Sequence, residues 1–140
     1  MSSLRPFHLA IPVDDLDAAK SFYCDLLGCG TGRTASRWID LDFFGHQVTL
    51  HLVDGSNLPA ASNPVDGDDV PARHFGLVMT RSDWEALAQR LEAGKARFLL
   101  RPRIRFEGEV GEQATMFVLD PAGNALEFKS FADDSRLFAK

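Results

Sequence analysis

Short apolar runs alternate with clusters of turn-forming residues along the whole chain. Residues 5–13 (RPFHLAIPV) predict a strand, and Asp14 and Asp15 after it are typical N-cap residues of a helix. Apolar residues then recur at helical spacing and predict one buried face, which consists of Ala19, Phe22, Tyr23, Leu26 and Leu27. Gly28 predicts the end of this helix, because glycine readily adopts the left-handed conformation found there.

The rest of the first half predicts a hairpin followed by a long loop. Two strand-like runs, residues 38–44 and 47–53, are separated by Gly45 and His46, which we expect to form the turn. Residues 54–71 (DGSNLPAASNPVDGDDVP) are rich in Gly, Pro, Asn, Asp and Ser, so we predict a loop that links two halves of the chain.

The second half begins again with a strand and a helix. Residues 73–80 (RHFGLVMT) predict the strand, and Ser82 and Glu85 have the spacing of a capping box at a helix start. The buried face of this helix is predicted to consist of Trp84, Leu87, Ala88 and Leu91. Gly94 predicts its end.

Further strands complete the second half. We predict a strand near residues 97–100 and an irregular polar stretch from there to residue 112. Residues 114–119 (ATMFVL) and 125–131 (ALEFKSF) then predict a hairpin around the turn 120–124 (DPAGN), whose proline and glycine suit a type I turn with a bulge.

The order strand, helix, several strands therefore occurs twice, with His8 and His74 lying 74 − 8 = 66 residues apart at the two opening strands. We predict an α+β fold of tandem βαβββ modules that form a curved mixed sheet around a cavity, with the helices on the outer face. The predicted parts of this single domain, residues 1–140, are a first module 5–53, a linker 54–71, a second module 72–132 and a tail 133–140.

Side chains along a strand point alternately to the two faces of a sheet, so the apolar positions identify the helix-covered face. In four strands this test leaves the following residues for the cavity face: His8 and Ala10; Gln47, Thr49 and His51; His74, Gly76 and Val78; Ala125, Glu127, Lys129 and Phe131. In residues 114–119, alternation does not decide between Thr115 with Phe117 and Ala114 with Met116.

Three residues of the cavity face form a candidate metal site. His8, His74 and Glu127 would supply two imidazoles and one carboxylate, the facial set that binds a first-row divalent ion and leaves positions open for water or substrate. Each residue alone is more simply explained as a half-buried histidine or a solvent-facing glutamate. Their placement at matching points of two repeats, with the carboxylate on a third strand of the same face, favours the metal site.

Other residues are candidates for binding a substrate. Lys129 would hold an anionic group, unless its stem only lies along the sheet edge. One arginine of the segment RPRIRFEGEVGEQ would offer a guanidinium to a carboxylate or phosphonate; we choose Arg105, with Arg101 and Arg103 solvated. The remaining candidates are Gln47, Thr49, Trp38 and Phe131, and core packing explains the two aromatic residues equally well.

Candidates for acid–base catalysis are few. They are His51 on the cavity face and Glu112 and Gln113 at the start of the last hairpin. We exclude His46, which we assign to a turn and whose parity points to the helix side or to solvent.

Composition excludes several other classes of protein. A length of 140 residues with 45% hydrophobic content allows one real core, and a net charge of −5 argues against nucleic acid or an anionic membrane as partner. The chain shows no secretory signal or apolar run of membrane-spanning length, so we expect a cytoplasmic protein. Cys24 and Cys29 fit neither a disulfide framework nor a zinc pair, and we expect both to be reduced.

Three segments carry a resemblance to a known family. LDAAKSFYCDLLG, HFGLVM and LDPAGNALEF resemble the vicinal oxygen chelate superfamily, which contains glyoxalase I, bleomycin-resistance proteins, extradiol dioxygenases and fosfomycin-resistance transferases. The segment DPxGNxxEF is the most specific of these, and the resemblance covers nearly the whole chain. It implies a homodimer that acts on or binds a small molecule.

The resemblance also implies a set of metal ligands. In metal-dependent members they are a histidine on the first strand, a histidine opening the second module and a glutamate after the DPxGN turn, which fall on His8, His74 and Glu127. Many glyoxalase-like members have a further ligand, often glutamate, on the fourth strand. This chain has QVTLH there, which leaves His51 or Gln47 as the candidate for a fourth ligand.

We therefore expect an enzyme that uses one divalent ion of iron, manganese, nickel, cobalt or zinc to bind a small oxygen-bearing substrate, as a dioxygenase or as a lyase or isomerase. The alternative is a metal-free protein that binds a drug or another small molecule, as bleomycin-resistance proteins do. A third hypothesis is a structural or regulatory domain whose pocket is vestigial.

Overall fold

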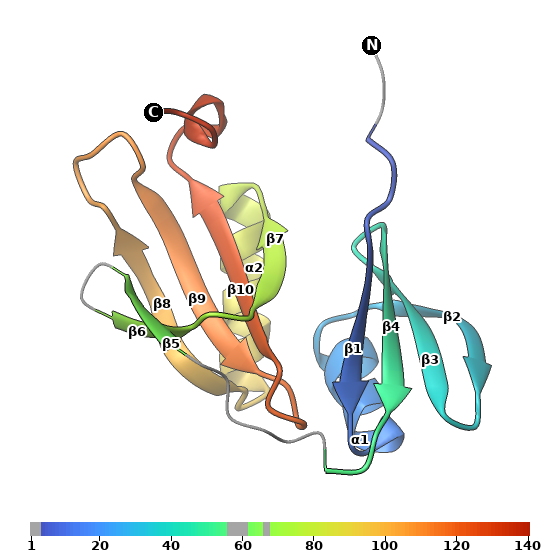
Figure 1. Cartoon of the computed structure of the whole chain (residues 1–140). Helices are drawn as coiled ribbons and strands as arrows, with labels where there is room; N and C mark the ends of the chain where they lie inside the picture. The colour runs from blue at the N-terminus through green and yellow to red at the C-terminus, as the bar shows by residue number, and fades with distance from the viewer. Residues whose placement is uncertain (1–3, 56–61, 66–67) are drawn as a thin grey trace. The chain divides into compact units, whose positions relative to one another are not determined.

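The computed structural model describes residues 4–55, 62–65 and 68–140 (Figure 1). These residues form two compact units. Unit 1 contains residues 4–55 and 121–124, and unit 2 contains residues 62–65, 68–120 and 125–140. Each unit has a four-stranded sheet and a helical segment, as the predicted βαβββ repeat requires.

Unit 1 has the strand order β1-β4-β3-β2, with β1 and β4 parallel and the other pairs antiparallel. Its elements are β1 (His8–Val13), α1 (Leu16–Lys20), a π-helical segment (Ser21–Leu26), β2 (Gly30–Ala35), β3 (Trp38–Phe43) and β4 (His46–Leu52).

The predicted first helix is confirmed, although its second half is π-helical rather than α-helical. Asp15 is the N-cap, and its carboxylate accepts a hydrogen bond of 3.0 Å from the Ala18 amide. Gly28 follows the helix with a φ of 81°, in the left-handed region. Four of the five predicted stripe residues are buried, and Leu26 is half-buried.

The turn of the hairpin between β3 and β4 lies one residue earlier than predicted. Phe44 and Gly45 have φ values of 53° and 90°, so they form the centre of the turn, and His46 is the first residue of β4. The ring nitrogen Nδ1 of His46 accepts a hydrogen bond of 2.8 Å from the Phe7 amide. Assigning His46 to the turn was therefore wrong.

Unit 2 has the strand order β7-β10-β9-β8, with β7 and β10 parallel and the other pairs antiparallel, and a separate two-stranded ribbon. Its elements are the ribbon strands β5 (Ser62–Val65) and β6 (Asp68–Pro71), then β7 (Phe75–Val78), α2 (Arg81–Ala93), β8 (Arg97–Arg105), β9 (Gln113–Leu119), β10 (Ala125–Phe131) and a 3-10 turn (Asp134–Arg136).

Helix α2 begins earlier than the predicted capping box. Its N-cap is Thr80, whose hydroxyl accepts a hydrogen bond of 3.2 Å from the Asp83 amide, so the assignment of the cap to Ser82 was wrong. The predicted stripe is confirmed, because Trp84, Leu87, Ala88 and Leu91 are all buried. The Trp84 indole donates a hydrogen bond of 2.8 Å to the Phe128 carbonyl and so ties the helix to β10.

Two segments predicted as irregular contain strands. The predicted linker 54–71 includes the paired strands β5 and β6. Strand β8 continues to Arg105, so the polar stretch after residue 100 is extended chain that pairs with β9, with register shifts on either side of Leu100.

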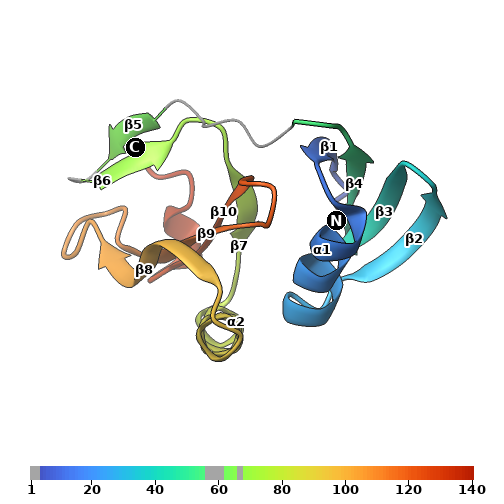
Figure 2. The ribbon, with the colours of Figure 1, turned by 90° about the horizontal axis from the view of Figure 1, so that it is seen from below.

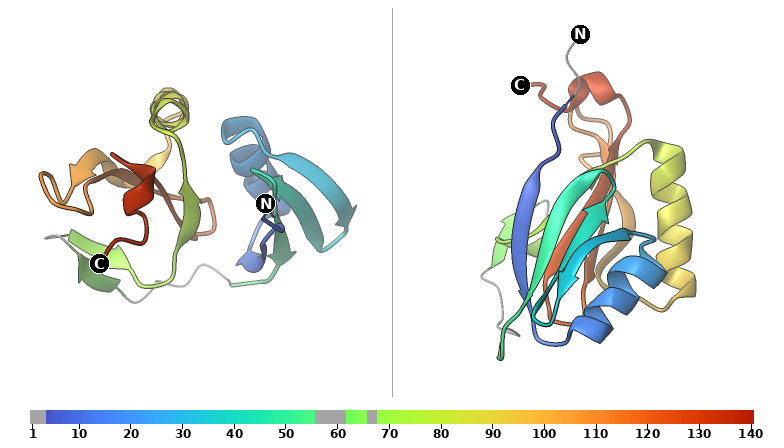
Figure 3. Two further views of the ribbon diagram at one scale, coloured as in Figure 1. Left: turned by 90° about the horizontal axis from the view of Figure 1, so that it is seen from above. Right: turned by 90° about the vertical axis from the view of Figure 1, so that its right-hand side faces the viewer.

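In each unit one sheet face is apolar and packed, and we call the opposite face the open face. The open face also has buried residues, among them Thr115 and Phe117 in unit 2 and Asp40 and Thr49 in unit 1. Helix α2 lies along one face of the β7-β10-β9-β8 sheet, and the β5–β6 ribbon lies on the other side (Figures 2 and 3). Leu126 and Phe128 are fully buried on the helix side. In the part of the chain that the structure describes, no helix is long and apolar enough to cross a membrane.

Candidate metal centre

Two of the three predicted metal ligands lie together on the open face of unit 2. The Nε2 atom of His74 is 3.3 Å from Oε1 of Glu127. His74 immediately precedes β7, while Glu127 is the third residue of β10, and the parallel pairing of these strands brings the two side chains together. Both are only partly accessible, with 29% and 12% of their side chains exposed.

The second ring nitrogen of His74 has a fixed partner. Its Nδ1 lies 2.6 Å from the Pro71 carbonyl oxygen, which can only accept, so Nδ1 carries a proton and donates it. In the neutral imidazole the Nε2 lone pair then faces the Glu127 carboxylate. Two acceptors in this position require a cation, which is either a proton on Nε2 or a metal ion. A metal-binding histidine commonly donates its other N–H to a backbone carbonyl in this way.

Glu127 is also held by a second partner. The Thr115 hydroxyl donates a hydrogen bond of 2.5 Å to Oε2, which leaves Oε1 directed toward His74. The hydrogen bond to Glu127 raises the pKa of His74. Burial opposes ionisation of Glu127, but the hydrogen bonds from His74 and Thr115 outweigh it and lower the pKa of this carboxyl. The pair therefore favours a carboxylate beside a cation.

A glycine allows the two strands to approach closely at this point. A Cβ atom at Gly76 would lie 1.5 Å from the carbonyl oxygen of Glu127 and 2.5 Å from its carbonyl carbon. No side chain fits there. Gly76 pairs with Glu127 and lies two residues after His74, so this contact is part of what positions the two candidate ligands.

The rest of the open face of unit 2 contains aromatic and cationic side chains. Phe117 pairs with Glu127. Its ring packs edge-on against the His74 ring, and the two ring centres are 4.8 Å apart. The buried guanidinium of Arg105 lies 6.0 Å from the centre of the Phe117 ring. Lys129 lies 5.9 Å from the centre of the Phe131 ring, and its charge helps to lower the pKa of Glu127. Strand pairing thus answers the open question in β9: Thr115 and Phe117 share the face of Glu127.

The two predicted catalytic residues of unit 2 are farther away. Gln113 pairs with Phe131, four residues from the Glu127 row, which is about 13 Å along the sheet at the usual strand rise. Its side-chain amide donates to the Gly111 carbonyl at 3.2 Å.

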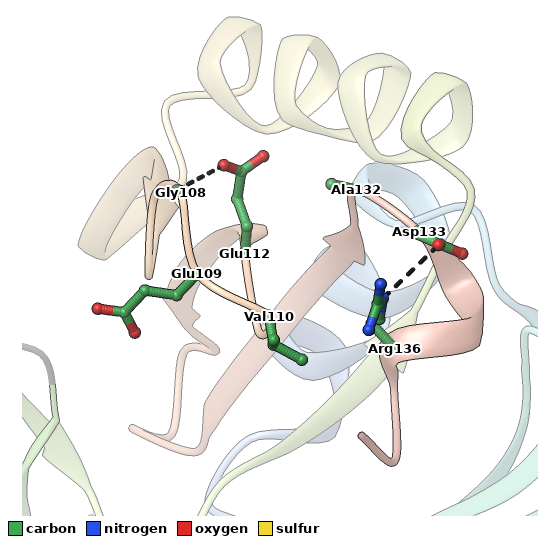
Figure 4. Close-up of a pocket in the computed structure, with 7 residues that line it drawn as sticks. All are labelled: Gly108, Glu109, Val110, Glu112, Ala132, Asp133 and Arg136. Atoms are coloured by element: carbon green, nitrogen blue, oxygen red, sulfur yellow. Dashed lines mark hydrogen bonds and ion pairs between the residues drawn. The ribbon is translucent and has the colours of Figure 1, made fainter. Parts of the chain in front are cut away.

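Glu112 accepts a hydrogen bond of 2.8 Å from the Gly108 amide and lines a cavity of about 410 Å³ between the β8–β9 loop and the segment after β10 (Figure 4). Asp133 and Arg136 line the other side of this cavity and form an ion pair of 3.8 Å. The Glu112 carboxylate thus holds the β8–β9 loop.

The third predicted ligand, His8, is on the open face of unit 1. It is exposed, while Ile11 and Val13 on the other face of β1 are buried. His8 pairs with Gln47 in β4. His51 pairs with Trp38, four residues farther along β4, so Gln47 rather than His51 is the neighbour of His8.

The sequence reasoning missed one residue of this face. Asp40 is 8% exposed and pairs with Thr49, whose hydroxyl donates a hydrogen bond of 2.7 Å to its Oδ1. The alternation of the segment WIDLDF indicates this position, because Ile39, Leu41 and Phe43 are the buried members of the strand.

A known family matches most of the chain. The family model for the Glyoxalase/Bleomycin resistance protein/Dioxygenase superfamily matches residues 5–128. The chain belongs to this superfamily. Its predicted α+β fold of βαβββ modules is thereby confirmed.

Three solved structures agree with the fold. A glyoxalase/bleomycin resistance protein/dioxygenase from Alicyclobacillus acidocaldarius is 36% identical, with a TM-score of 0.83 over 95% of this chain and 96% of that chain. The genomically encoded fosfomycin resistance protein FosX from Listeria monocytogenes is 16% identical, with a TM-score of 0.69 over 98% and 99% of the two chains. Lactoylglutathione lyase from Agrobacterium tumefaciens is 19% identical, with a TM-score of 0.64 over 100% and 98%. The last two likenesses concern the fold alone.

The donor set present in unit 2 is a pair rather than a complete site. Among the residues that the structure describes, no three His, Cys, Asp or Glu side chains form a cluster. The pair of His74 and Glu127 nevertheless has the chemistry of two metal ligands with partners of their own.

Proposed function

We propose that this protein is a metal-dependent enzyme of the glyoxalase and dioxygenase type, in which His8, His74 and Glu127 hold one divalent ion. The observation that carries the proposal is the hydrogen-bonded series from the Pro71 carbonyl through His74 and Glu127 to Thr115. It fixes the imidazole tautomer and the carboxylate orientation that a metal ion needs.

A purely structural role explains this series less well. A histidine and a glutamate that only stabilise a fold need no close strand contact that excludes every side chain at Gly76. They also need no carbonyl that holds the far ring nitrogen at 2.6 Å. With both features in place, Nε2 of His74 and Oε1 of Glu127 lie 3.3 Å apart. Neutral imidazole and carboxylate are ligands that suit a first-row divalent ion.

His8 is proposed as the third ligand because of its position in the repeat. It lies at the start of β1, and His74 lies immediately before β7. Gln47, its partner in β4, is the proposed fourth ligand or substrate contact. The glyoxalase superfamily resemblance supports the same three ligands.

The proposed substrate is a small molecule that chelates the ion through two oxygen atoms. An ion with open positions polarises such oxygens and stabilises negative charge that develops on them, whichever of iron, manganese, nickel, cobalt or zinc it is. Lys129 lies on the same face of β10 as Glu127 and is proposed to contact the substrate. We propose ring-cleaving dioxygenation or a lyase or isomerase reaction, in a cytoplasmic homodimer.

Elemental analysis of protein purified without chelator or affinity tag tests the proposal. Wild type should carry close to one equivalent of a divalent metal, and His8→Ala and Glu127→Ala should each lose it. His46→Ala is the matched control, because it removes an imidazole of unit 1 that accepts the Phe7 amide, and it should keep the metal. If wild type is empty and cannot be loaded, the ligand assignment is wrong and a metal-free binding protein is the better account.

A further inference from the structure

Asp40 is a buried carboxylate on the open face of unit 1 that the proposed metal site does not use. It is 8% exposed and lies in the middle of β3, on the face opposite the packed residues Ile39 and Leu41. A carboxylate in such a position needs compensating donors. Thr49 supplies one to Oδ1 at 2.7 Å.

The other oxygen of Asp40 has a weaker partner. Oδ2 lies 4.0 Å from Nε of Arg33, whose side chain is 85% exposed. At this distance and exposure the ion pair contributes little, because water screens it. The Arg33 guanidinium lies instead over the Trp38 ring, 5.6 Å from the ring centre. Oδ2 is thus the oxygen of Asp40 that a bound molecule would reach.

A cavity of about 430 Å³ lies beside Asp40, and its lining includes Thr31, Arg33, Asp42 and Gln47. Two carboxylates and one guanidinium leave this lining with a net negative charge. Gly32 lies above Asp40, where a Cβ atom would already be 3.4 Å from the Asp40 Cβ, so a larger residue there would crowd the carboxylate. The cavity is suited to a cationic group.

The distance from Asp40 to His8 is one that a small, extended molecule spans. His8, Gln47 and Asp42 form one row across β1, β4 and β3, and Asp40 lies two residues beyond Asp42. Two strand spacings and two residues of strand rise place the Cα atoms of His8 and Asp40 about 12 Å apart. Ala10, which pairs with Thr49, is a small residue between them.

We propose that Asp40 determines specificity by binding a protonated amine at the end of the substrate remote from the metal. This inference rests on the proposed function. Thr49 is then a positioning residue for Asp40 rather than a direct substrate contact, because its hydroxyl proton is already donated to Oδ1.

Two hydroxamates test the inference on the zinc-loaded protein. Each chelates a metal ion through two oxygens; 6-aminohexanehydroxamic acid also carries an amine at the end of a pentamethylene chain, whereas hexanehydroxamic acid does not. Calorimetry should show that wild type binds the amino compound at least about tenfold more tightly, as expected for one charge-assisted hydrogen bond. Asp40→Asn should reduce this ratio to about two, and Thr49→Val should give an intermediate value.

Asp17→Asn is the matched control, because it makes the same change of charge on helix α1 and should keep the wild-type ratio. Unfolding curves of all variants would show whether the ratio changes without loss of the fold. Equal binding of the two hydroxamates by wild type, or an unchanged ratio in Asp40→Asn, would overturn the inference and leave the metal site standing. If neither hydroxamate binds, the proposed function itself fails, and the inference fails with it.

Discussion

Replacement of Gly76 by alanine should separate strand β7 from β10. The new Cβ atom would lie 1.5 Å from the Glu127 carbonyl oxygen, whereas carbon and oxygen in weak contact stay at least about 3.3 Å apart. The strands would have to move by about 3.3 − 1.5 = 1.8 Å. Hydrogen bonds between them would lengthen to about 4.7 Å, which is no longer bonding.

The loss of two or three such bonds should cost about 2–4 kcal/mol in the free energy of unfolding. The same displacement separates His74 from Glu127, so Gly76→Ala should also lose the metal although it alters no ligand. Denaturant unfolding, followed by circular dichroism, and elemental analysis measure the two effects.

Gly111→Ala is the control for this prediction. A Cβ atom at Gly111 meets nothing within 4 Å, and the residue has no positive φ, so this variant should be within about 0.5 kcal/mol of wild type or slightly more stable. If Gly76→Ala were as stable as Gly111→Ala and kept its metal, the close strand contact would not be what holds the two ligands.

Three further predictions concern the same unit. Thr115→Val, which removes the donor to Oε2 of Glu127, should weaken metal affinity by about 10–100-fold in a competition with a chromophoric chelator, and an unchanged affinity would refute the role of Thr115. In the metal-free protein the pKa of His74 is raised from 6.5 and that of Glu127 is lowered from 4.5. The stability that the pair contributes should therefore be complete between about pH 4.5 and 6.5, and it should fall above this window as His74 loses its proton and below it as Glu127 gains one. Unfolding at a series of pH values measures this, and Glu127→Gln should remove both slopes. Trp84→Phe removes the hydrogen bond that the indole donates to the Phe128 carbonyl and should lower the free energy of unfolding by about 1–3 kcal/mol, which a shift of less than 0.5 kcal/mol in denaturant titrations would contradict.

The elements that the sequence predicts well are those with a strong apolar period. The stripe of Trp84, Leu87, Ala88 and Leu91 and the alternation of β1 and β10 all identify the packed face correctly. Strand β2 was not predicted from the sequence, because its residues, GTGRTA, are all exposed at a sheet edge, where no apolar alternation is required. The extension of β8 beyond residue 100 was not predicted either, because the residues there, RPRIR, are mostly charged.

The candidate site was predicted in part. His74 and Glu127 were placed on one face by alternation, and the structure brings them within 3.3 Å. Thr115 could not be assigned to a face, because six consecutive residues of β9 are buried on both sides and alternation disappears. The close contact at Gly76 depends on the separation of two strands, which a single sequence does not encode locally. The position of Asp40 can be inferred from the alternation of polar and apolar residues around it, although the sequence analysis did not do so.

X-ray absorption at the metal edge tests the central claim most directly, because it counts the imidazoles bound to the ion. The account predicts two imidazoles and additional oxygen ligands in wild type, and one imidazole in both His8→Ala and His74→Ala reloaded with excess metal. His46→Ala should give the wild-type spectrum. A wild-type spectrum with no imidazole, or one that is the same in His8→Ala and His74→Ala as in wild type, would contradict the assignment of these histidines as ligands.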